Sequence, residues 1–398
     1  MKWFPVFFTD KYYGAKQKGT VQMKINSIET GYISIPLITP FKTALRTVSS
    51  VNDLIVKIVA DDGTVGYGEA PPTAVITGDT KESIEAAIRG YIAPAILGME
   101  FDSDESLAAV MAAMEKSIAK NTTPKSAVDM ALYDMYARSK KMPLFRLLQK
   151  EAADTESFPV TIETDITISV NEPEEMVADS LRAKQDGFRI LKVKVGKGGS
   201  RDVERIRLIR EAVGPEMVIR VDANQGWSPE EAVRTIRAME DAGVGIELVE
   251  QPVSCHDFKG LKAVTAAVDT PILADESVFS VEDAGRILEE HGADLINIKL
   301  MKTGGIHNAL RICDLADQYD VKCMMGCMLE SKVSVSAGAH LAAARSCITM
   351  ADLDGPSLCR EDPYEGGPEY LGAMIRLNET PGIGITKMPV VFENVKLR

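Results

Sequence analysis

The chain has 398 residues, of which 45% are apolar and 26% charged, and its formal net charge is −13. This length predicts more than one domain, and the composition is that of a soluble globular protein. The acidic balance, with no basic block, disfavours nucleic-acid binding, which depends on neutralising phosphates. No segment reaches the roughly 20 apolar residues that a membrane-spanning helix requires.

Residues 1–22 do not fit a signal peptide. Their apolar stretch, 3–8, is short, ends at Asp10 and Lys11, and is followed by no small-residue cleavage site. We expect 1–22 to be an extension outside the fold, either disordered or packed on a neighbouring subunit. The six cysteines form no paired zinc motif, so reduced thiols and a cytoplasmic location are favoured.

An α+β capping domain is predicted over 23–155. Residues 54–59 form a strand that turns at Asp62-Gly63 and returns at 65–68, and the pattern from 79 to 150 is helical. The last residues, 356–398, follow the last predicted strand of the chain and are expected to rejoin this domain.

Strand and helix patterns alternate over 156–355. Helical stretches such as 229–242 and 281–290 separate the strands. Eight alternations favour a (β/α)8-type barrel, and an open doubly wound sheet is disfavoured because no Gly-rich dinucleotide turn follows a first strand. The eight expected strands are 164–170, 189–196, 218–226, 246–252, 271–277, 294–301, 322–328 and 348–354.

Three successive barrel strands end in a carboxylate, namely Asp222, Glu250 and Asp275. The carboxyl ends of parallel barrel strands meet at one mouth, and clustered carboxylates without His or Cys favour Mg²⁺ over Zn²⁺. The alternative is three surface carboxylates near helix N-termini. Asn224 shares a side of its strand with Asp222 and could help to hold the metal or substrate, or be a turn residue.

Lysines flank these carboxylates. Lys192 and Lys194 share one face of the second strand, and Lys299 ends the sixth strand across the ring. A neighbouring ammonium and a bound cation both disfavour protonation, so a lysine here could act as a base near neutral pH. We expect Lys302 to extend into solvent. None of the four histidines ends a barrel strand, which disfavours histidine base chemistry and a Ser-His-Asp hydrolase.

Further polar groups surround the mouth. Asp352 and Asp354 end the eighth strand and could accept an ammonium group, or form an Asx turn before Gly-Pro. The backbone after the seventh strand could bind substrate, and the loops at 41–47 and 73–78 could cover the mouth. Arg46 could clamp a substrate carboxylate, although the residue pattern alone favours a solvated loop arginine.

The combination of Lys192-x-Lys194, Asp222, Glu250, Asp275 and Lys299 resembles the enolase superfamily, and within it the muconate lactonizing enzyme subgroup. The resemblance covers about 23–398 and implies a modified (β/α)7β barrel. Use of a lysine base with Mg²⁺ to stabilise an ene-diolate is an established property of that superfamily. Asp352-Leu353-Asp354 resembles the D-x-D signature of dipeptide epimerases, and the segments 41–48 and 76–79 are similar to the members specific for L-Ala-D/L-Glu.

By this resemblance the three carboxylates bind Mg²⁺, Lys194 and Lys299 are the two acid/base groups, and Lys192 steadies the enolate oxygen. It implies that Asp352 and Asp354 hold the α-ammonium of a dipeptide and that Arg46 meets a Glu side chain. The remaining implied pocket residues are Thr167, Cys327, Met328 and Leu329.

The implied function is Mg²⁺-dependent epimerisation of L-Ala-D/L-Glu in murein peptide metabolism. It proceeds by 1,1-proton transfer at the α-carbon of the C-terminal residue, and we expect a homo-oligomer. The alternatives are an epimerase for other dipeptides, an o-succinylbenzoate synthase or cycloisomerase, and a non-catalytic carboxylate-binding barrel. The paired aspartates favour an ammonium-bearing substrate, and two opposed lysines disfavour a role in binding alone.

Overall fold

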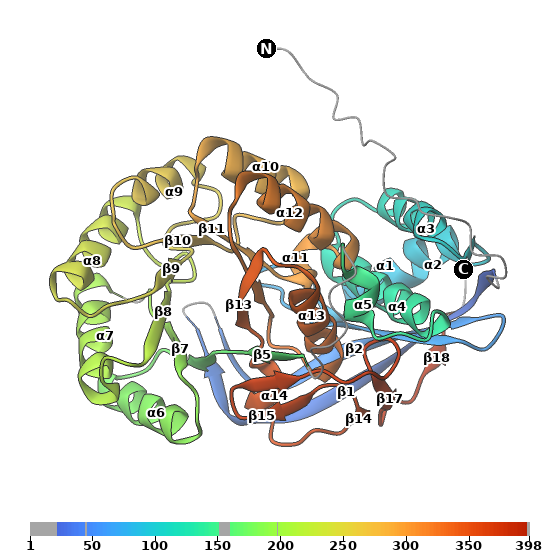
Figure 1. The fold of residues 1–398 in the computed structure, drawn as a ribbon, viewed down its shortest axis with the longest axis horizontal. Helices are drawn as coiled ribbons and strands as arrows, with labels where there is room; N and C mark the ends of the chain where they lie inside the picture. Colours follow the sequence, from blue (N-terminus) through green and yellow to red (C-terminus); the bar gives the residue numbers. More distant parts are fainter. Residues whose placement is uncertain (1–21, 44–45, 151–159, 197, 396–398) are drawn as a thin grey trace, which may run out of the picture.

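The structure is a computed structural model that describes residues 22–43, 46–150, 160–196 and 198–395. The extension predicted for 1–22 therefore lies outside the described residues, apart from residue 22. The described chain forms a parallel barrel beside an antiparallel sheet covered by helices (Figure 1). Among the residues described, none of the helices combines the length and apolar character needed to cross a bilayer.

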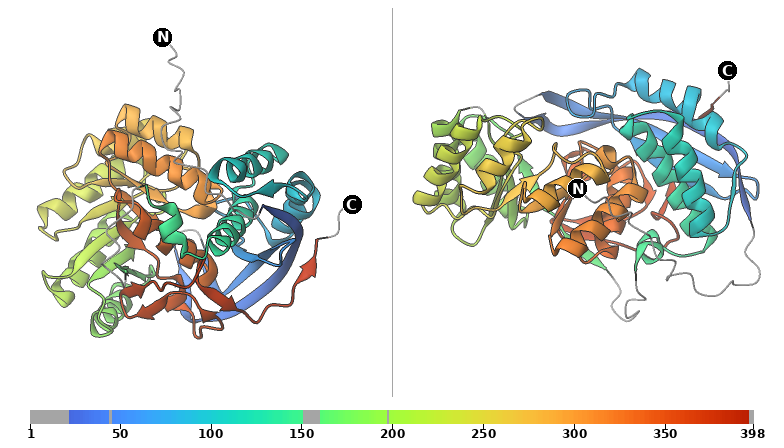
Figure 2. Two further views of the ribbon diagram at one scale, coloured as in Figure 1. Left: turned by 45° about the vertical axis from the view of Figure 1, so that its right-hand side comes forward. Right: turned by 90° about the horizontal axis from the view of Figure 1, so that it is seen from above.

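The N-terminal sheet is built on a long hairpin. Strand β1 (Met23–Lys42) pairs antiparallel with β2 (Thr47–Ala60), which pairs with β3 (Val65–Ala70). The hairpin reaches from this sheet to the barrel, as Figure 2 shows, and the Lys42 backbone N–H donates to Ser169 Oγ at 3.0 Å. One end of β1 is thereby held at the barrel.

Helix α4 (Thr122–Ser139) packs against this sheet and is buried on nearly every side. Glycines in β3 allow the close approach, because a Cβ on Gly68 would overlap the Ala127 carbonyl oxygen. The other helical elements here are α1 (Lys81–Ala87), η1 (Ile88–Ile92), α2 (Ala93–Ile96), α3 (Asp104–Ser117) and α5 (Leu144–Leu148), with the short strand β4 (Glu100–Phe101) between α2 and α3.

All eight predicted barrel strands are present, each shorter than expected. They pair in parallel in chain order, and the first and last are joined by a contact from the Asp165 N–H to the Ala351 carbonyl at 3.3 Å. Each strand ends at the mouth of the barrel, where the following loop begins. The strands are β6 (Ile166–Ile168), β7 (Ile190–Lys194), β8 (Val218–Asp222), β9 (Leu248–Glu250), β10 (Ile272–Ala274), β11 (Leu295–Ile298), β12 (Cys323–Gly326) and β13 (Ile348–Asp352).

Helices follow seven of these strands; six are amphipathic, and the last, α13 (Lys332–Ala344), is buried along most of its length. In α10 (Val281–Glu290), for example, Ala284, Ile287 and Leu288 are buried, and the Ser280 side chain caps the helix by accepting from the Asp283 N–H. The eighth strand is followed only by the one-turn α14 (Gly355–Leu358), which confirms the (β/α)7β form. The helices are α6 (Pro173–Gln185), α7 (Gly199–Val213), α8 (Pro229–Asp241), α9 (Phe258–Thr265), α10 (Val281–Glu290), α12 (Ile306–Tyr319) and α13 (Lys332–Ala344), with the one-turn α11 (Leu300–Thr303) before α12.

After the barrel the chain returns to the N-terminal sheet. Strand β18 (Glu393–Asn394) pairs with β1. The preceding small strands pair with one another and with β5 (Thr161–Glu163), which precedes the barrel. These small strands are β14 (Glu365–Gly366), β15 (Glu369–Leu371), β16 (Met374–Arg376) and β17 (Ile385–Lys387).

Candidate active site

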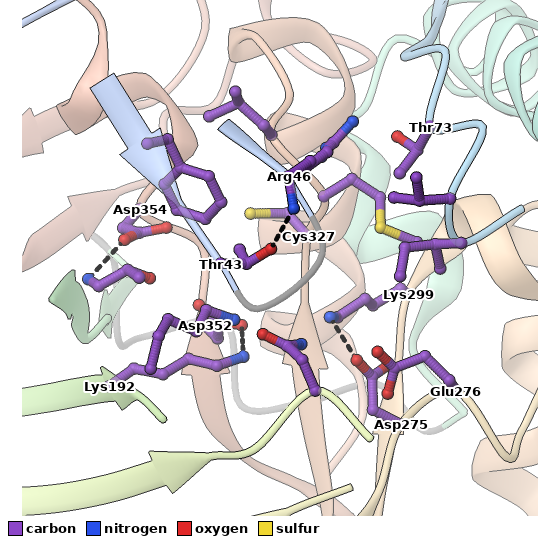
Figure 3. A pocket seen from close by; sticks show the side chains of 18 of the residues that line it. Thr43, Arg46, Thr73, Lys192, Asp275, Glu276, Lys299, Cys327, Asp352 and Asp354 are labelled. Atoms are coloured by element: carbon purple, nitrogen blue, oxygen red, sulfur yellow. Dashed lines mark hydrogen bonds and ion pairs between the residues drawn. The ribbon is translucent and has the colours of Figure 1, made fainter. Parts of the chain in front are cut away.

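The carboxyl ends of the barrel strands open into one cavity beneath the N-terminal loops (Figure 3). The predicted residues that line it come from seven barrel strands or the loops after them and from the β1–β2 loop. Asp222 and Glu250 lie beneath the cavity, in contact with its lysines. The predicted residues in the lining are Arg46, Thr167, Lys192, Lys194, Asn224, Asp275, Lys299, Cys327, Met328, Leu329, Asp352 and Asp354.

Lys192 lies at the centre of a buried charge network. Its Nζ is 2.6 Å from Asp352 Oδ2, 2.7 Å from Glu250 Oε2 and 3.2 Å from Asp222 Oδ2. Lys194, two residues later on the same face of β7, places its Nζ 2.6 Å from Asp222 Oδ2. The lysines and carboxylates expected at the mouth are therefore brought together.

Lys299 approaches from the other side of the barrel. It follows β11, and its Nζ lies 2.7 Å from Asp275 Oδ2 and 3.7 Å from Glu250 Oε1. In Figure 3, Lys299 with Asp275 and Lys192 with Asp352 lie on opposite sides of the cavity. The two lysine-bearing strands thus present ammonium groups to one space from two directions.

Burial and the opposing charges set the protonation of these groups. Burial alone raises the pKa of Asp222, but Lys194 and Lys192 outweigh it and hold that pKa at about 2. Burial and the charge of Asp222 raise the pKa of Glu250 to about 7. Burial lowers the pKa of Lys299, yet Asp275 and Glu250 reverse this effect and leave it above the usual range. Without a bound cation, the neighbouring carboxylates therefore favour the protonated form of Lys299. The expectation of a base near neutral pH includes a bound cation and stays a prediction.

The prediction that Lys302 extends into solvent is wrong. Its side chain is fully buried, its Nζ lies 2.7 Å from Asp275 Oδ1, and it donates to the carbonyl oxygens of Asn297, at 3.0 Å, and Asp275. Helix α11 packs against α4, so the lysine turns inward beneath the mouth. Burial lowers the pKa of Lys302, opposed by Asp275.

The carboxylates fit a hard cation by their donor chemistry. Within the described ranges, no three His, Cys, Asp or Glu side chains already form a compact ligand set, because lysine ammoniums lie among the carboxylates. Nevertheless, Asn224 Oδ1 and Asp275 Oδ1 are buried and accept no hydrogen bond, although Lys302 forms an ion pair with the latter. Such oxygen donors suit Mg²⁺, which Asp222, Glu250 and Asp275 would hold.

The paired aspartates lie at the β13 side of the cavity. Both side chains are buried. Asp352 Oδ2 accepts a hydrogen bond from Lys192 Nζ, and Asp354 Oδ2 accepts one from the Thr167 N–H at 2.7 Å. Burial and the charge of Asp352 raise the pKa of Asp354 to about 6. The pair presents negative charge to the cavity across from Asp275.

The loops expected to cover the mouth do line it. Phe41 and Thr43 come from the first loop, and Thr73, Val75 and Ile76 come from the second. Arg46 is half-buried, and its backbone N–H donates to Thr43 Oγ1 at 3.2 Å. The side chain lines the cavity, so the solvated position that the residue pattern favoured for Arg46 is wrong.

Sequence reasoning missed Glu276 and Leu358 in the lining. Glu276 follows Asp275, is 4% exposed, and neither of its carboxyl oxygens has a hydrogen-bond partner. Burial and the charges of Asp275 and Asp222 raise the pKa of Glu276 to about 8. Its position directly after Asp275, at the end of a barrel strand, was the sequence signal that could have identified Glu276 as a cavity residue.

A parallel barrel that gathers strand-end lysines and carboxylates under an antiparallel N-terminal domain defines the class of this protein. The chain belongs to the mandelate racemase/muconate lactonizing enzyme family of the enolase superfamily. Its residues 28–149 match the family's N-terminal domain, and residues 175–389 match the enolase C-terminal domain-like family.

Within this class the chain is similar to dipeptide epimerases. It is 52% identical to the L-Ala-D/L-Glu epimerase of Clostridium acetobutylicum over 91% of this chain and 99% of that protein. The substrate-liganded L-Ala-D/L-Glu epimerase of Bacillus subtilis has a TM-score of 0.87 at 48% identity, covering 92% of this chain and 99% of that one. A dipeptide epimerase of Enterococcus faecalis, complexed with Mg and L-Leu-L-Tyr, has a TM-score of 0.85 at 39% identity, covering 92% and 100%.

Proposed function

We propose that this protein is a Mg²⁺-dependent dipeptide epimerase that inverts the α-carbon of the C-terminal residue, with L-Ala-D/L-Glu as substrate. The observation that carries this proposal is the placement of Lys194 and Lys299. They come from the second and sixth positions of the barrel ring and line the same cavity, with acidic residues between them. Inversion at one carbon requires proton removal from one face and delivery to the other, which two opposed lysines can perform.

The aspartate pair supports an ammonium-bearing substrate. Asp352 and Asp354 are buried in the cavity wall across from Asp275, so a dipeptide can span from its ammonium at this pair to its carboxylate beside the metal ligands. Lys192 lies between these two regions, where its ammonium can stabilise the carboxylate oxygen that becomes enolate. In either direction of the reaction, the lysine that does not remove the α-proton is the proton donor.

Asp222, Glu250 and Asp275 would hold Mg²⁺, which would stabilise the second negative charge that develops on the substrate carboxylate. The protein's own residues do the remaining work. Lys194 removes the α-proton in one direction of the reaction and Lys299 in the other. The loops at 41–47 and 73–78 limit the access of water, since described residues of both line the cavity.

The acidic second residue is supported by Arg46 and by the relatives. The arginine side chain lines the cavity, where its guanidinium can pair with a γ-carboxylate. Relatives at 52% and 49% identity are L-Ala-D/L-Glu epimerases, whereas a hydrophobic dipeptide epimerase and a D-Ala-D/L-Ala epimerase are 39% and 37% identical. A role in murein peptide metabolism follows from that substrate.

The cellular setting is part of the proposal. All six cysteines lie among the described residues and are free, five of them buried, which supports a cytoplasmic location. A homo-oligomeric state and the domain limits 23–155, 156–355 and 356–398 stay predictions. The proposed partner is the dipeptide, and the net charge of −13 disfavours nucleic acid.

The decisive experiment is proton NMR of L-Ala-L-Glu with enzyme and Mg²⁺ in D₂O, beside a panel of other dipeptides. Loss of the Glu α-proton signal together with growth of L-Ala-D-Glu is the expected result. Exchange only with another dipeptide would retain the chemistry and reject the acidic specificity. Absence of exchange with every dipeptide would reject the proposed function and leave the elimination or binding-only alternatives.

A further inference from the structure

Glu276 is a buried carboxylate for which the proposed reaction has no use. It follows β10 directly after Asp275 and lines the cavity. Figure 3 shows it beside Asp275 on the side of the cavity that carries Lys299. Its side chain is 4% exposed, yet neither carboxyl oxygen accepts a hydrogen bond.

The other acidic side chains that line this cavity all have partners. Asp275 is paired with Lys299 and Lys302, Asp352 is paired with Lys192, and Asp354 accepts the Thr167 N–H. Glu276 has no ion pair within 4.0 Å among the residues that the structure describes. Burying a carboxylate without a hydrogen-bond or ion-pair partner costs free energy. We therefore expect the Glu276 carboxylate to contact a bound ligand in the working enzyme.

Asn224 provides a second, independent observation at the same place. Its side chain is buried at the end of β8 and lines the cavity, and its Oδ1 accepts no hydrogen bond. Glu276 and Asn224 therefore each add unpartnered oxygen acceptors next to a proposed metal ligand, Glu276 beside Asp275 and Asn224 beside Asp222. The substrate ammonium is assigned to Asp352 and Asp354 at the other side of the cavity, so it does not satisfy these oxygens.

We propose that Glu276 belongs to the cation centre and strengthens Mg²⁺ binding through a water molecule held by the ion. Mg²⁺ dehydrates reluctantly and usually keeps several waters, which require acceptors. A carboxylate beside Asp275, with both oxygens free, is such an acceptor. This inference rests on the Mg²⁺ centre of the proposed function, but not on which dipeptide is epimerised.

The test is isothermal titration calorimetry of Mg²⁺ into the full-length wild-type protein and Glu276→Gln, without substrate. Loss of a group that hydrogen-bonds to a metal's direct ligands typically weakens metal binding by about 10- to 100-fold. We expect the Kd for Mg²⁺ to rise by that factor in Glu276→Gln. Thermal melting in EDTA should show Glu276→Gln to be at least as stable as the wild type, because the amide replaces a buried carboxyl group that has no hydrogen-bond partner.

Glu330→Gln is the matched control. Glu330 is also a buried glutamate just beyond a barrel strand, but it lies outside the cavity lining and accepts from the Met328 N–H at 2.6 Å and from the Ser334 hydroxyl. We expect this variant to lose stability while keeping the wild-type Kd for Mg²⁺. An equal weakening in both variants would overturn the proposal, since the effect would then be general.

A Kd for Glu276→Gln within about twofold of the wild type would also overturn it, since loss of a metal-site acceptor costs about tenfold or more. If that variant does not fold, Glu276→Ala takes its place under the same criterion. Wild-type protein that binds Mg²⁺ but epimerises no dipeptide would reject the proposed function and leave this inference standing. Wild-type protein that does not bind Mg²⁺ would reject both.

Discussion

The ammonium of Lys302 lies 2.7 Å from Oδ1 of Asp275, and both side chains are buried beneath the mouth of the barrel. Lys299 approaches the other oxygen of the same carboxylate at 2.7 Å. Asp275 is therefore held between two lysines, one inside the cavity lining and one outside it. This gives Lys302 a positioning role for a proposed metal ligand.

Replacing Lys302 with Met should destabilise the protein. The buried Asp275 carboxylate would lose one of its cations, and two buried carbonyl oxygens would lose their hydrogen-bond donor. Removing one member of a buried ion pair typically lowers the free energy of unfolding by about 3–5 kcal/mol. Urea unfolding in EDTA measures the loss. Lys322→Met, at a half-exposed lysine paired with the exposed Asp320, is the control and should change little. A loss below about 1 kcal/mol for Lys302→Met would contradict the positioning role.

Alanine at Lys194 or at Lys299 should lower kcat for epimerisation by at least about 10²- to 10⁴-fold and leave the fold intact. Because the lysines are proposed to act on opposite faces, each variant should retain α-proton exchange with only one of the two diastereomers. Proton NMR in D₂O with L-Ala-L-Glu and L-Ala-D-Glu measured separately checks this. A Lys299→Ala enzyme that epimerises within about tenfold of the wild-type rate would rule out the two-base scheme.

Arg46→Ala should raise KM for L-Ala-L-Glu by about 10- to 100-fold, since a hydrogen bond to a charged group contributes roughly 1.5–3 kcal/mol. The KM for L-Ala-L-Gln should change much less, because its side chain carries no charge. Steady-state kinetics with the two dipeptides gives the comparison. Equal increases for both substrates would show that Arg46 shapes the loop rather than selects the acidic side chain.

Substrate affinity should weaken on the acid side through Asp354. Burial and Asp352 raise its pKa to about 6, so the carboxylate is charged above that pH and neutral below it. An ammonium is attracted only by the charged form, and KM should therefore rise as the pH falls through about 6. In Asp354→Asn the KM should be higher at pH 8 and this acid-side rise should disappear. The prediction fails if the variant keeps the wild-type pH profile of KM.

Protein stability should also fall with pH through His340. This histidine is buried against Phe145 and accepts its backbone N–H at 3.1 Å, and burial lowers its pKa from 6.5 to about 3. The unfolded chain binds the proton more tightly, so the stabilisation present above pH 6.5 is lost progressively as the pH falls from 6.5 towards 3.

Between pH 6.5 and 5 this loss amounts to about 2 kcal/mol. His340→Gln removes the titrating group, so its stability should fall less over the same pH interval, even though the variant is less stable at pH 7. Urea unfolding of both proteins at pH 7, 6 and 5 makes the comparison. Parallel stability curves would show that His340 does not contribute to the acid sensitivity.

The sequence by itself determined the barrel and most of the residues that meet in it. A parallel strand has one carboxyl end, and in a closed barrel these ends share one mouth, so Lys194, Asp222, Glu250 and Asp275 had to converge. The two-residue period of a strand likewise places Lys192 and Lys194 on one side. These relationships depend on local geometry and chain order, both of which the sequence carries.

Only the tertiary structure decided the environment of the remaining groups. Lys302 is buried because α11 packs against α4 from a distant part of the sequence, and Arg46 reaches the cavity because the β1–β2 hairpin extends to the barrel. The raised pKa of Lys299 depends on its distances to Asp275 and Glu250. Burial and electrostatics follow from which segments meet in space and how closely, and residue spacing along one strand contains neither quantity.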